Sequence, residues 1–265
     1  MKTVLVTGST DGIGREVARE LGQRGARVLV HGRSREKAER AVKALRDETG
    51  GAFEAVAGDF ARLEEVRALA ADVVARFARI DVLVNNAGIY TKEHVERTLL
   101  VNHLAPFALT HRLLDAIVDG GRIVFVSSNV HRSAEPQELI NRLIDFPGAA
   151  ADGYAAYAES KLANVLTAFE LARRLAARRI AVNAMHPGVI ATKLLHEGFG
   201  GSGGADVARG AAGEIRLAID PALDGVTGKY FDQTHEARAA AAASDAALQT
   251  RVYELSLERT GVEPA

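Results

Sequence analysis

Short apolar segments alternate with segments of helical periodicity along the whole chain, and this alternation restricts the fold more than any other feature. The apolar segments are residues 2–6, 27–30, 53–57, 80–84, 121–127 and 180–184. The segments with helical spacing are residues 13–25, 36–48, 63–77, 95–118 and 154–178. Short strands without polar alternation are typical of strands buried on both faces. We therefore predict one doubly wound α/β domain over residues 1–265, with a parallel sheet covered by helices on both sides.

Composition excludes several classes of protein. The chain has 265 residues, 48% of them apolar and 25% charged, which is ordinary for a globular domain. It has no cysteine, so disulfides and thiolate chemistry are excluded. A net charge of -1 gives no electrostatic reason to expect a nucleic acid or an anionic membrane as partner. The N-terminus reads directly into a strand without a secretory signal, and no apolar run approaches the ~20 residues of a membrane span. We expect a cytoplasmic protein that acts on a small molecule, with homo-oligomerisation left open.

A glycine-rich turn joins the first strand to the first helix. Residues 7–14 read TGSTDGIG, with the spacing G-x-x-x-G-x-G in place of the commoner G-x-G-x-x-G. Glycines here permit a tight turn and let backbone N–H groups approach a pyrophosphate at the positive end of a helix. The turn therefore predicts a dinucleotide site. Its expected contacts are Gly8, Ser9, Thr10, Gly12, Ile13 and Gly14.

The end of the second strand indicates which dinucleotide binds. An acidic residue about 20 positions past the glycines would bind the 2′-hydroxyl of NAD. Here the strand ends in His31, Gly32 and Arg33, without a carboxylate. Gly32 leaves space, and the planar guanidinium of Arg33 suits a 2′-phosphate. We therefore predict NADP(H), with a solvated surface arginine as the alternative interpretation of Arg33.

Seven motifs in order resemble the short-chain dehydrogenase/reductase family over nearly the whole chain. They are TGSTDGIG, GDF, NNAG, VNHLAPF, VSS, YAESK and HPG. RSREKAE, YAESKLANVLTAFELARRL, NAMHPGVIAT and VTGKYF are most similar to the branch of retinol dehydrogenases and protochlorophyllide reductases. The resemblance implies a Rossmann-type, seven-stranded parallel sheet. It also implies that Asp59 contacts the adenine, that Asn86 lines the cofactor cleft, and that Val189 and Thr192 hold the nicotinamide carboxamide. The remaining expected cofactor contacts are Phe60, Ala87, Gly88, Tyr157, Lys161 and Pro187.

Tyr157, Lys161 and Ser128 are the candidate catalytic residues. Reduction of a ketone by hydride creates an alkoxide that needs a proton, and a tyrosine phenol can supply it. Lys161 lies one helical turn from Tyr157 on the same face, and its charge is expected to lower the phenol's pKa. Tyr154 lies two turns from Lys161 and is expected to line the substrate pocket or to pack.

Ser128 follows the fifth apolar segment, where its hydroxyl can hold the substrate oxygen beside the phenol. Ser127 competes with it on sequence alone, and the family pattern selects Ser128. The same resemblance gives Asn102 the task of keeping a water near Lys161 and places that lysine on the nicotinamide ribose.

These residues predict an oxidoreductase that transfers a hydride between nicotinamide and a carbonyl or alcohol carbon of a small lipophilic substrate. A C=C (enone-type) reductase and a non-catalytic NADP(H)-binding regulator are the alternatives. No metal is expected, because the eight histidines lack ligand spacing. His131, near the presumed rim of the site, is expected to be exposed to solvent, with a role in contacting the substrate as the alternative.

Two long segments interrupt the alternation. Residues 129–152 form an insert between the fifth strand and the helix that carries Tyr157. Residues 194–205 include the run GFGGSGG. We expect the second segment to be a mobile lid over the substrate, ordered only when both ligands are bound, with a disordered loop as the alternative.

Overall fold

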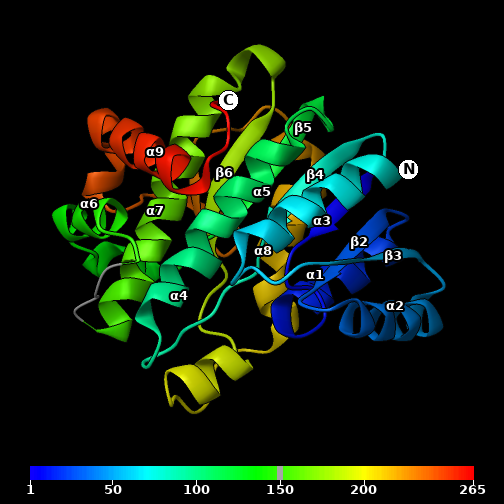
Figure 1. Cartoon of the computed structure of the whole chain (residues 1–265). Coiled ribbons are helices and arrows are strands. Elements are labelled where there is room, and N and C mark those ends of the chain that lie inside the picture. The colour runs from blue at the N-terminus through cyan, green and yellow to red at the C-terminus, as the bar shows by residue number, and fades with distance from the viewer. Residues whose placement is uncertain (148–151) are drawn as a thin grey trace.

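The computed structural model describes residues 1–147 and 152–265. Its centre is one sheet of eight strands in the order β3-β2-β1-β4-β5-β6-β7-β8 (Figure 1). Neighbouring strands pair in parallel from β3 through to β7. The strands are β1 (Thr3–Val6), β2 (Arg27–Gly32), β3 (Ala52–Ala57), β4 (Ile80–Asn85), β5 (Ile117–Val126), β6 (Ala181–His186), β7 (Tyr230–Asp232) and β8 (His235–Ala237). The predicted α/β class, with a parallel Rossmann-type sheet, is confirmed.

Helices cover both faces of this sheet because successive strand residues point to opposite sides. On one face Val4, Val6 and Val28 pack with buried residues of α1, α2 and α8. On the other face Leu5 and Phe125 pack with residues of α3, α5, α6, α7 and α9. The helices are α1 (Gly12–Gln23), α2 (Arg35–Thr49), α3 (Leu63–Arg76), α4 (Val95–Leu99), α5 (Ala105–Leu113), α6 (Pro136–Ile144), α7 (Gly153–Arg174), α8 (Val207–Ile219) and α9 (Ala246–Thr260). In the described part of the chain no helix has the length and hydropathy needed to cross a membrane.

The strand order reverses at β1, which lies between β2 and β4. The chain runs outward from β1 to β3 and then returns to β4 on the other side of β1. In doubly wound sheets such a switch point opens a crevice at the carboxyl ends of the strands, where ligands bind. The fold therefore brings the ends of β1, β2, β4, β5 and β6 to one edge of the molecule.

The structure corrects the predicted sheet and one predicted helix. An eighth strand, β8, follows β7 in a tight antiparallel hairpin. Gln233, in the turn of this hairpin, has a φ of 55°. The turn residues Gln233 and Thr234 are not the Asn-Gly or Gly-containing pair typical of tight hairpins, so the sequence pattern did not indicate a hairpin here. The expected helix 95–118 divides into α4, a π-helical turn (Leu100–Leu104) and α5. Ile117 belongs to β5 and pairs with Ile80. The sequence pattern was ambiguous here, because a short apolar run fits a buried strand as well as a helix.

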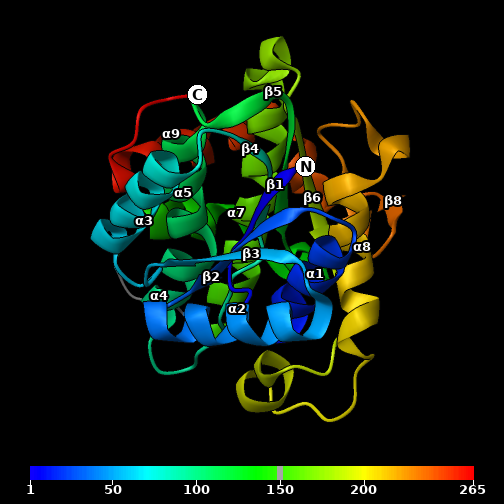
Figure 2. The same ribbon diagram turned by 90° about the vertical axis from the view of Figure 1, so that its right-hand side faces the viewer.

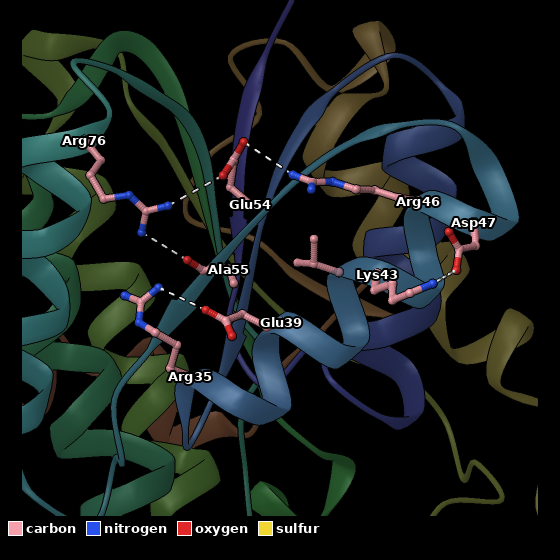
Figure 3. A pocket seen from close by; sticks show the side chains of 9 residues that line it. Arg35, Glu39, Lys43, Arg46, Asp47, Glu54, Ala55 and Arg76 are labelled. Carbon is pink, nitrogen blue, oxygen red and sulfur yellow. Dashed lines mark hydrogen bonds and ion pairs between the residues drawn. The ribbon is translucent and has the colours of Figure 1, made fainter.

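The edge strand β3 is bordered by charged side chains (Figure 3). Glu54 on this strand lies 3.6 Å from Arg46 of α2 and 3.6 Å from Arg76 of α3. Arg76 also donates a hydrogen bond to the carbonyl of Ala55 at 3.0 Å. Charged residues on an edge strand discourage pairing with another chain. The hollow between these side chains lies between β3, α2 and α3.

The two interrupting segments lie near the carboxyl edge. In the insert 129–152 a 3₁₀ turn (Asn129–Ser133) is followed by α6, which a buried ion pair between Arg142 and Glu159 ties to α7. Residues 148–151 of the insert lie outside the described residues. The segment 194–205, yellow in Figures 1 and 2, lies beyond the carboxyl ends of the strands in both views. It begins with a π-helical turn (Leu194–Gly198), and a bridge between Ile190 and Ala205 closes its base.

Candidate active site

The glycine turn after β1 is close-packed against the end of β4. A Cβ at Gly8 would lie 2.9 Å from the Cα of Ala87, and Gly8 has a φ of +65°. A Cβ at Gly14 would lie 2.4 Å from the side-chain nitrogen of Asn86 and 2.6 Å from the carbonyl of Gly8. No other residue fits at these two positions. The turn thus places the start of α1 directly at the switch point of the sheet.

His31, at the end of β2, holds this turn in place. The backbone N–H of Gly8 donates to its Nδ1 at 3.0 Å, so the other ring nitrogen carries the proton and donates to the carbonyl of Gly58 at 2.9 Å. Burial lowers the pKa of His31 to about 4, and the ring is neutral near pH 7. Ser9 is also internal, because its hydroxyl donates to Val6 and accepts from the His31 backbone. Sequence reasoning gave His31 no role, since its partners lie 23 and 27 residues away.

The residues expected at the adenosine end lie around the ends of β2 and β3. A Cβ at Gly32 would lie 2.8 Å from the methyl of Thr10, so the glycine lets the turn pack onto β2. Arg33 is exposed and makes no hydrogen bond or ion pair with any residue the structure describes. Asp59 is half-buried and accepts a bond from the backbone of Ala61 at 3.0 Å. Phe60 is buried, with its ring centroid 4.6 Å from that of His31, so only its backbone remains available to a ligand.

The segment after β4 is held from both sides. The hydroxyl of Thr7 accepts from the backbone of Asn86 and of Ala87 at 3.0 Å each. Asn102, in the π-helical turn, accepts from the backbone of Ile89 at 2.7 Å and donates back to its carbonyl at 2.9 Å. This pair of hydrogen bonds fixes the loop that passes Gly88. A Cβ at Gly88 would lie 3.4 Å from the ammonium of Lys161. A π-turn inside a helix frequently marks a functional site.

Helix α7 carries the two central side chains. Asp152 caps the helix by accepting from the backbone of Ala155 at 2.8 Å. Tyr157 is 6% exposed and Lys161 is 3% exposed, and both lie toward the carboxyl end of β5. The Lys161 ammonium donates to the carbonyl of Val126 at 3.0 Å and lies 5.4 Å from the centroid of the Tyr157 ring. The predicted pair is therefore brought together one helical turn apart, as the spacing requires.

Burial dominates the protonation of this pair. It raises the pKa of Tyr157, and an interaction with the Ser128 hydroxyl opposes that shift. The expected lowering of this pKa by Lys161 does not prevail, because the ammonium is directed at Val126 and not at the phenol oxygen. Burial lowers the pKa of Lys161 to about 8, against the attraction of Glu214. Burial also raises the pKa of Glu214 itself to about 8. Near pH 7 the site therefore holds a neutral phenol and a charged ammonium.

The two serines at the end of β5 have different partners. Ser127 is buried and donates its hydroxyl to the carbonyl of Lys161 at 2.7 Å. Ser128 is half-buried and its hydroxyl faces Tyr157. The structure thus leaves Ser128, and not Ser127, available to a ligand. His131 was expected to be exposed, which is wrong: it is buried, and its ring contacts Ser128 and Ala240 at 2.6 and 2.9 Å.

The turn after β6 faces the start of α1. The methyl of Thr192 lies 3.7 Å from the Cβ position of Gly12. Lys193 forms an ion pair of 2.7 Å with Asp11, which caps α1 by accepting from the Gly12 backbone at 2.8 Å. Val189 is 63% exposed at the same edge. The expected contacts Pro187, Val189 and Thr192 therefore lie across the crevice from α7.

Two aromatic rings complete the edge. Tyr90, just after the loop at Gly88, stacks on Phe199 with 4.1 Å between the ring centroids. Both rings stand nearly perpendicular to Tyr157, with centroids 5.7 and 5.2 Å from its ring. Phe199 belongs to the segment expected to be a lid. Tyr90 was missed, because its partner is more than 100 residues away and no local pattern marks it.

The arrangement fits an extended dinucleotide. The glycine turn offers helix N–H groups to a diphosphate, Arg33 lies free at one end, and Tyr157 and Lys161 lie at the other. A side chain at Gly8 or Gly14 would break this cradle. Among the described residues no cluster of three or more His, Asp or Glu side chains could hold a metal ion.

Comparisons with known proteins agree with this geometry. The family description "short chain dehydrogenase" matches residues 2–139. Human retinol dehydrogenase 13 is 35% identical over 99% of this chain and 85% of its own length. The putative daunorubicin C-13 ketoreductase of Streptomyces sp. (strain C5) is 33% identical over 98% of this chain and 93% of its own.

Solved structures give the same result. A putative uncharacterized protein from Mycobacterium paratuberculosis superposes with a TM-score of 0.81 and 29% identity, covering 100% of this chain and 96% of its own. The landomycin C-6 ketoreductase LanV with bound NADP and rabelomycin has a TM-score of 0.69 and 31% identity, covering 88% of this chain and 94% of its own. A blue fluorescent protein from a metagenomic library, solved with NADPH, has a TM-score of 0.71, 28% identity and coverage of 87% of this chain and 95% of its own.

Proposed function

Because the chain belongs to the short-chain dehydrogenase/reductase family of oxidoreductases, we propose that it is an NADP(H)-dependent carbonyl reductase or alcohol dehydrogenase. Its substrate is a small lipophilic molecule, and Tyr157 is its general acid/base. The observation that carries the proposal is the convergence of Tyr157, Lys161 and Ser128 at the carboxyl end of β5, opposite the glycine turn. Relatives named as retinol dehydrogenases and ketoreductases support exchange between an alcohol and a carbonyl.

NADP(H) would lie across the carboxyl edge and supply or accept the hydride. The N–H groups of the glycine turn would bind its diphosphate, and the exposed guanidinium of Arg33 would bind its 2′-phosphate. Asp59 would contact the adenine, and Asn86, whose side chain donates to the carbonyls of Thr7 and Gly8, would line the cleft. Solved relatives that contain NADP or NADPH support the choice of cofactor.

The side chains of the site would move a single proton. Ser128 would hold the substrate oxygen beside the phenol of Tyr157, which is the geometry that proton transfer needs. The raised pKa of Tyr157 keeps the phenol protonated near neutral pH, so it can donate to the oxygen of a carbonyl as that carbonyl is reduced. The Lys161 ammonium, one helical turn away, would offset part of the cost of the phenolate that remains. The protonated phenol is the form that carbonyl reduction requires.

A substrate screen with product analysis tests the proposal. Purified protein and NADPH would be followed at the nicotinamide absorbance against matched aldehydes, ketones, quinones and enones. We expect consumption of NADPH with ketones or aldehydes and recovery of the corresponding alcohols. Recovery of saturated ketones from enones would identify a C=C reductase instead. Tight NADPH binding without turnover of any carbonyl would contradict the proposal and identify a binding protein.

A further inference from the structure

Tyr90 and Phe199 have no part in the proposed proton transfer, yet they are the aromatic neighbours of the Tyr157 ring. Their own rings are stacked, with centroids 4.1 Å apart and an angle of 20°. Their angles to the Tyr157 ring are 81° and 79°. The two rings therefore form one flat block, which we call the aromatic wall, at a right angle to the phenol.

The wall is built from two separate loops at the carboxyl edge. Tyr90 follows the loop that Asn102 clamps through Ile89. Phe199 ends the helical turn Leu194–Gly198. Gly198 lets the two loops meet, because a Cβ there would lie 3.1 Å from the ring of Tyr90. The contact between the loops is thus made by ring faces, close to the reacting phenol.

The wall retains exposed apolar surface. Both rings are half-buried, in contrast to the large core rings such as Phe53 and Phe125, which are fully buried. Two of the few exposed large apolar side chains, Tyr154 at 45% and Val189 at 63%, lie at the same edge of the molecule. An apolar surface around a few polar groups is typical of a small-molecule site.

We propose that the aromatic wall selects planar, aryl-conjugated ketones over saturated ketones of the same size. The inference rests on the proposed function and names its substrate class. A carbonyl held by Ser128 and Tyr157 would carry its attached ring alongside the wall, within the 4.5–7 Å at which aromatic rings attract one another. A favourable contact with one ring corresponds to a roughly two- to tenfold gain in affinity beyond that from burial alone.

The segment that carries Phe199 has anchors that do not involve this ring. Lys193 pairs with Asp11 at 2.7 Å, and the backbone of Ala191 donates to Ala205 at 2.8 Å. Replacing Phe199 by leucine keeps an apolar side chain and these two anchors while it removes the ring face. Loss of aromatic selectivity can therefore be separated from loss of the segment.

The test compares 1-tetralone with 1-decalone, two bicyclic ketones that differ in one aromatic ring. The variants are Phe199→Leu and Tyr90→Leu, and the control is Phe169→Leu, which removes a half-buried aromatic ring that packs against the core farther along α7, away from the wall. For wild type we expect kcat/KM to favour tetralone. Each wall variant should reduce that ratio about two- to tenfold. The control should keep it. NADPH affinity should be unchanged in all three variants.

Two outcomes separate this inference from the proposed function. Turnover of both ketones, with a ratio that neither wall variant changes, overturns the aromatic wall and leaves the reductase standing. Absence of turnover of every carbonyl overturns the reductase. In that case titration of both ketones into the protein loaded with NADP⁺ tests the selectivity of the aromatic wall separately. Equal affinities for the two ketones, unchanged in the wall variants, would overturn the inference.

Discussion

Individual residues at this edge differ sharply in what their surroundings let them do. Ser127 and Ser128 are adjacent and chemically identical, but they point to opposite sides of the strand end. The hydroxyl of Ser127 donates to the backbone carbonyl of Lys161, whereas the hydroxyl of Ser128 lies beside Tyr157. Tyr154 and Tyr157 differ in the same way, because the first is 45% exposed and the second 6% exposed. Burial therefore distinguishes the two nearby phenols, and the proposed acid/base task falls to the buried one.

Tyr157→Phe is expected to abolish most turnover while NADPH still binds. Phenylalanine keeps the ring against the aromatic wall but has no proton to donate, and loss of a general acid costs ~10²- to 10⁴-fold in rate. Steady-state kinetics on the best ketone, together with a fluorescence titration of NADPH, would measure both effects. Tyr154→Phe serves as the matched control. A Tyr157→Phe rate above a tenth of wild type would show that another group donates the proton.

Arg33→Ala is expected to weaken NADPH binding much more than NADH binding. A hydrogen bond to a charged group contributes about 1.5–3 kcal/mol, which corresponds to roughly ten- to a hundredfold in affinity. Arg35→Ala is the control, because this neighbouring arginine is already paired with Glu39 and Asp72 at 3.8 and 3.7 Å. Titration of both cofactors would decide the matter. Equal losses for NADPH and NADH would show that Arg33 does not contact the 2′-phosphate.

At the scale of elements, local patterns predicted what depends on neighbours in the sequence. The glycine turn, the position of Ser128 at the end of β5 and the spacing of Tyr157 and Lys161 on α7 all follow from a few consecutive residues. The hairpin of β7 and β8 and the division of 95–118 could not be predicted. The hairpin lacks a turn signal in its sequence. The end of the 95–118 segment could be helix or strand, and its pairing with β4 decides which.

Contacts between distant segments were also beyond prediction. The bond from Gly8 to His31 links two strand ends, and the stack of Tyr90 on Phe199 links two loops far apart in the chain. Each of these residues alone resembles an ordinary surface or core residue. Only the folded sheet, which brings the carboxyl ends of its strands to one edge, reveals that they belong to the site.

The segment 194–205 is expected to become more protected when substrate joins the cofactor. Phe199 already contacts Tyr90 and Tyr157, and five glycines between 198 and 204 give the backbone freedom to adjust. Hydrogen exchange on the free protein, the NADPH complex and a ternary complex would measure this, with α3 as an internal reference. Equal, rapid exchange in all three states, with normal activity after Leu195→Ser and Phe199→Ser, would rule out a lid.

At the scale of the whole molecule, neutral histidines join elements in the interior. His111 of α5 contacts the hydroxyl of Tyr253 on α9 at 2.9 Å, and His103 reaches Ser256 of α9 at 2.8 Å. His31 holds the glycine turn to the ends of β2 and β3. Burial lowers the pKa of His31, His103, His111 and His186 to about 4. Protonation of any of them therefore costs the folded state stability.

These histidines set the sign of the acid response. In the pH range between the folded pKa of about 4 and the unfolded pKa near 6.5, these histidines bind protons in the unfolded chain but not in the folded protein. The free energy of unfolding must therefore fall as pH drops through this window, by up to about 3 kcal/mol per histidine. Glu214 acts in the opposite direction, because its raised pKa of about 8 makes the fold gain stability on acidification from about pH 8 to about pH 4.5. Four histidines outweigh this one carboxyl.

We therefore expect the protein to lose several kcal/mol of stability between about pH 7 and about pH 5, well above the pH at which most carboxylates titrate. Urea unfolding across this range would measure the loss. His111→Gln should flatten the pH dependence, because glutamine can still bond to Tyr253 or Phe107 but does not titrate. Glu214→Gln should steepen it, since it removes the opposing carboxyl. A free energy of unfolding that stays constant down to about pH 5 would mean that the buried histidines accept protons without cost. The same slope in wild type and His111→Gln would exclude that residue as a contributor.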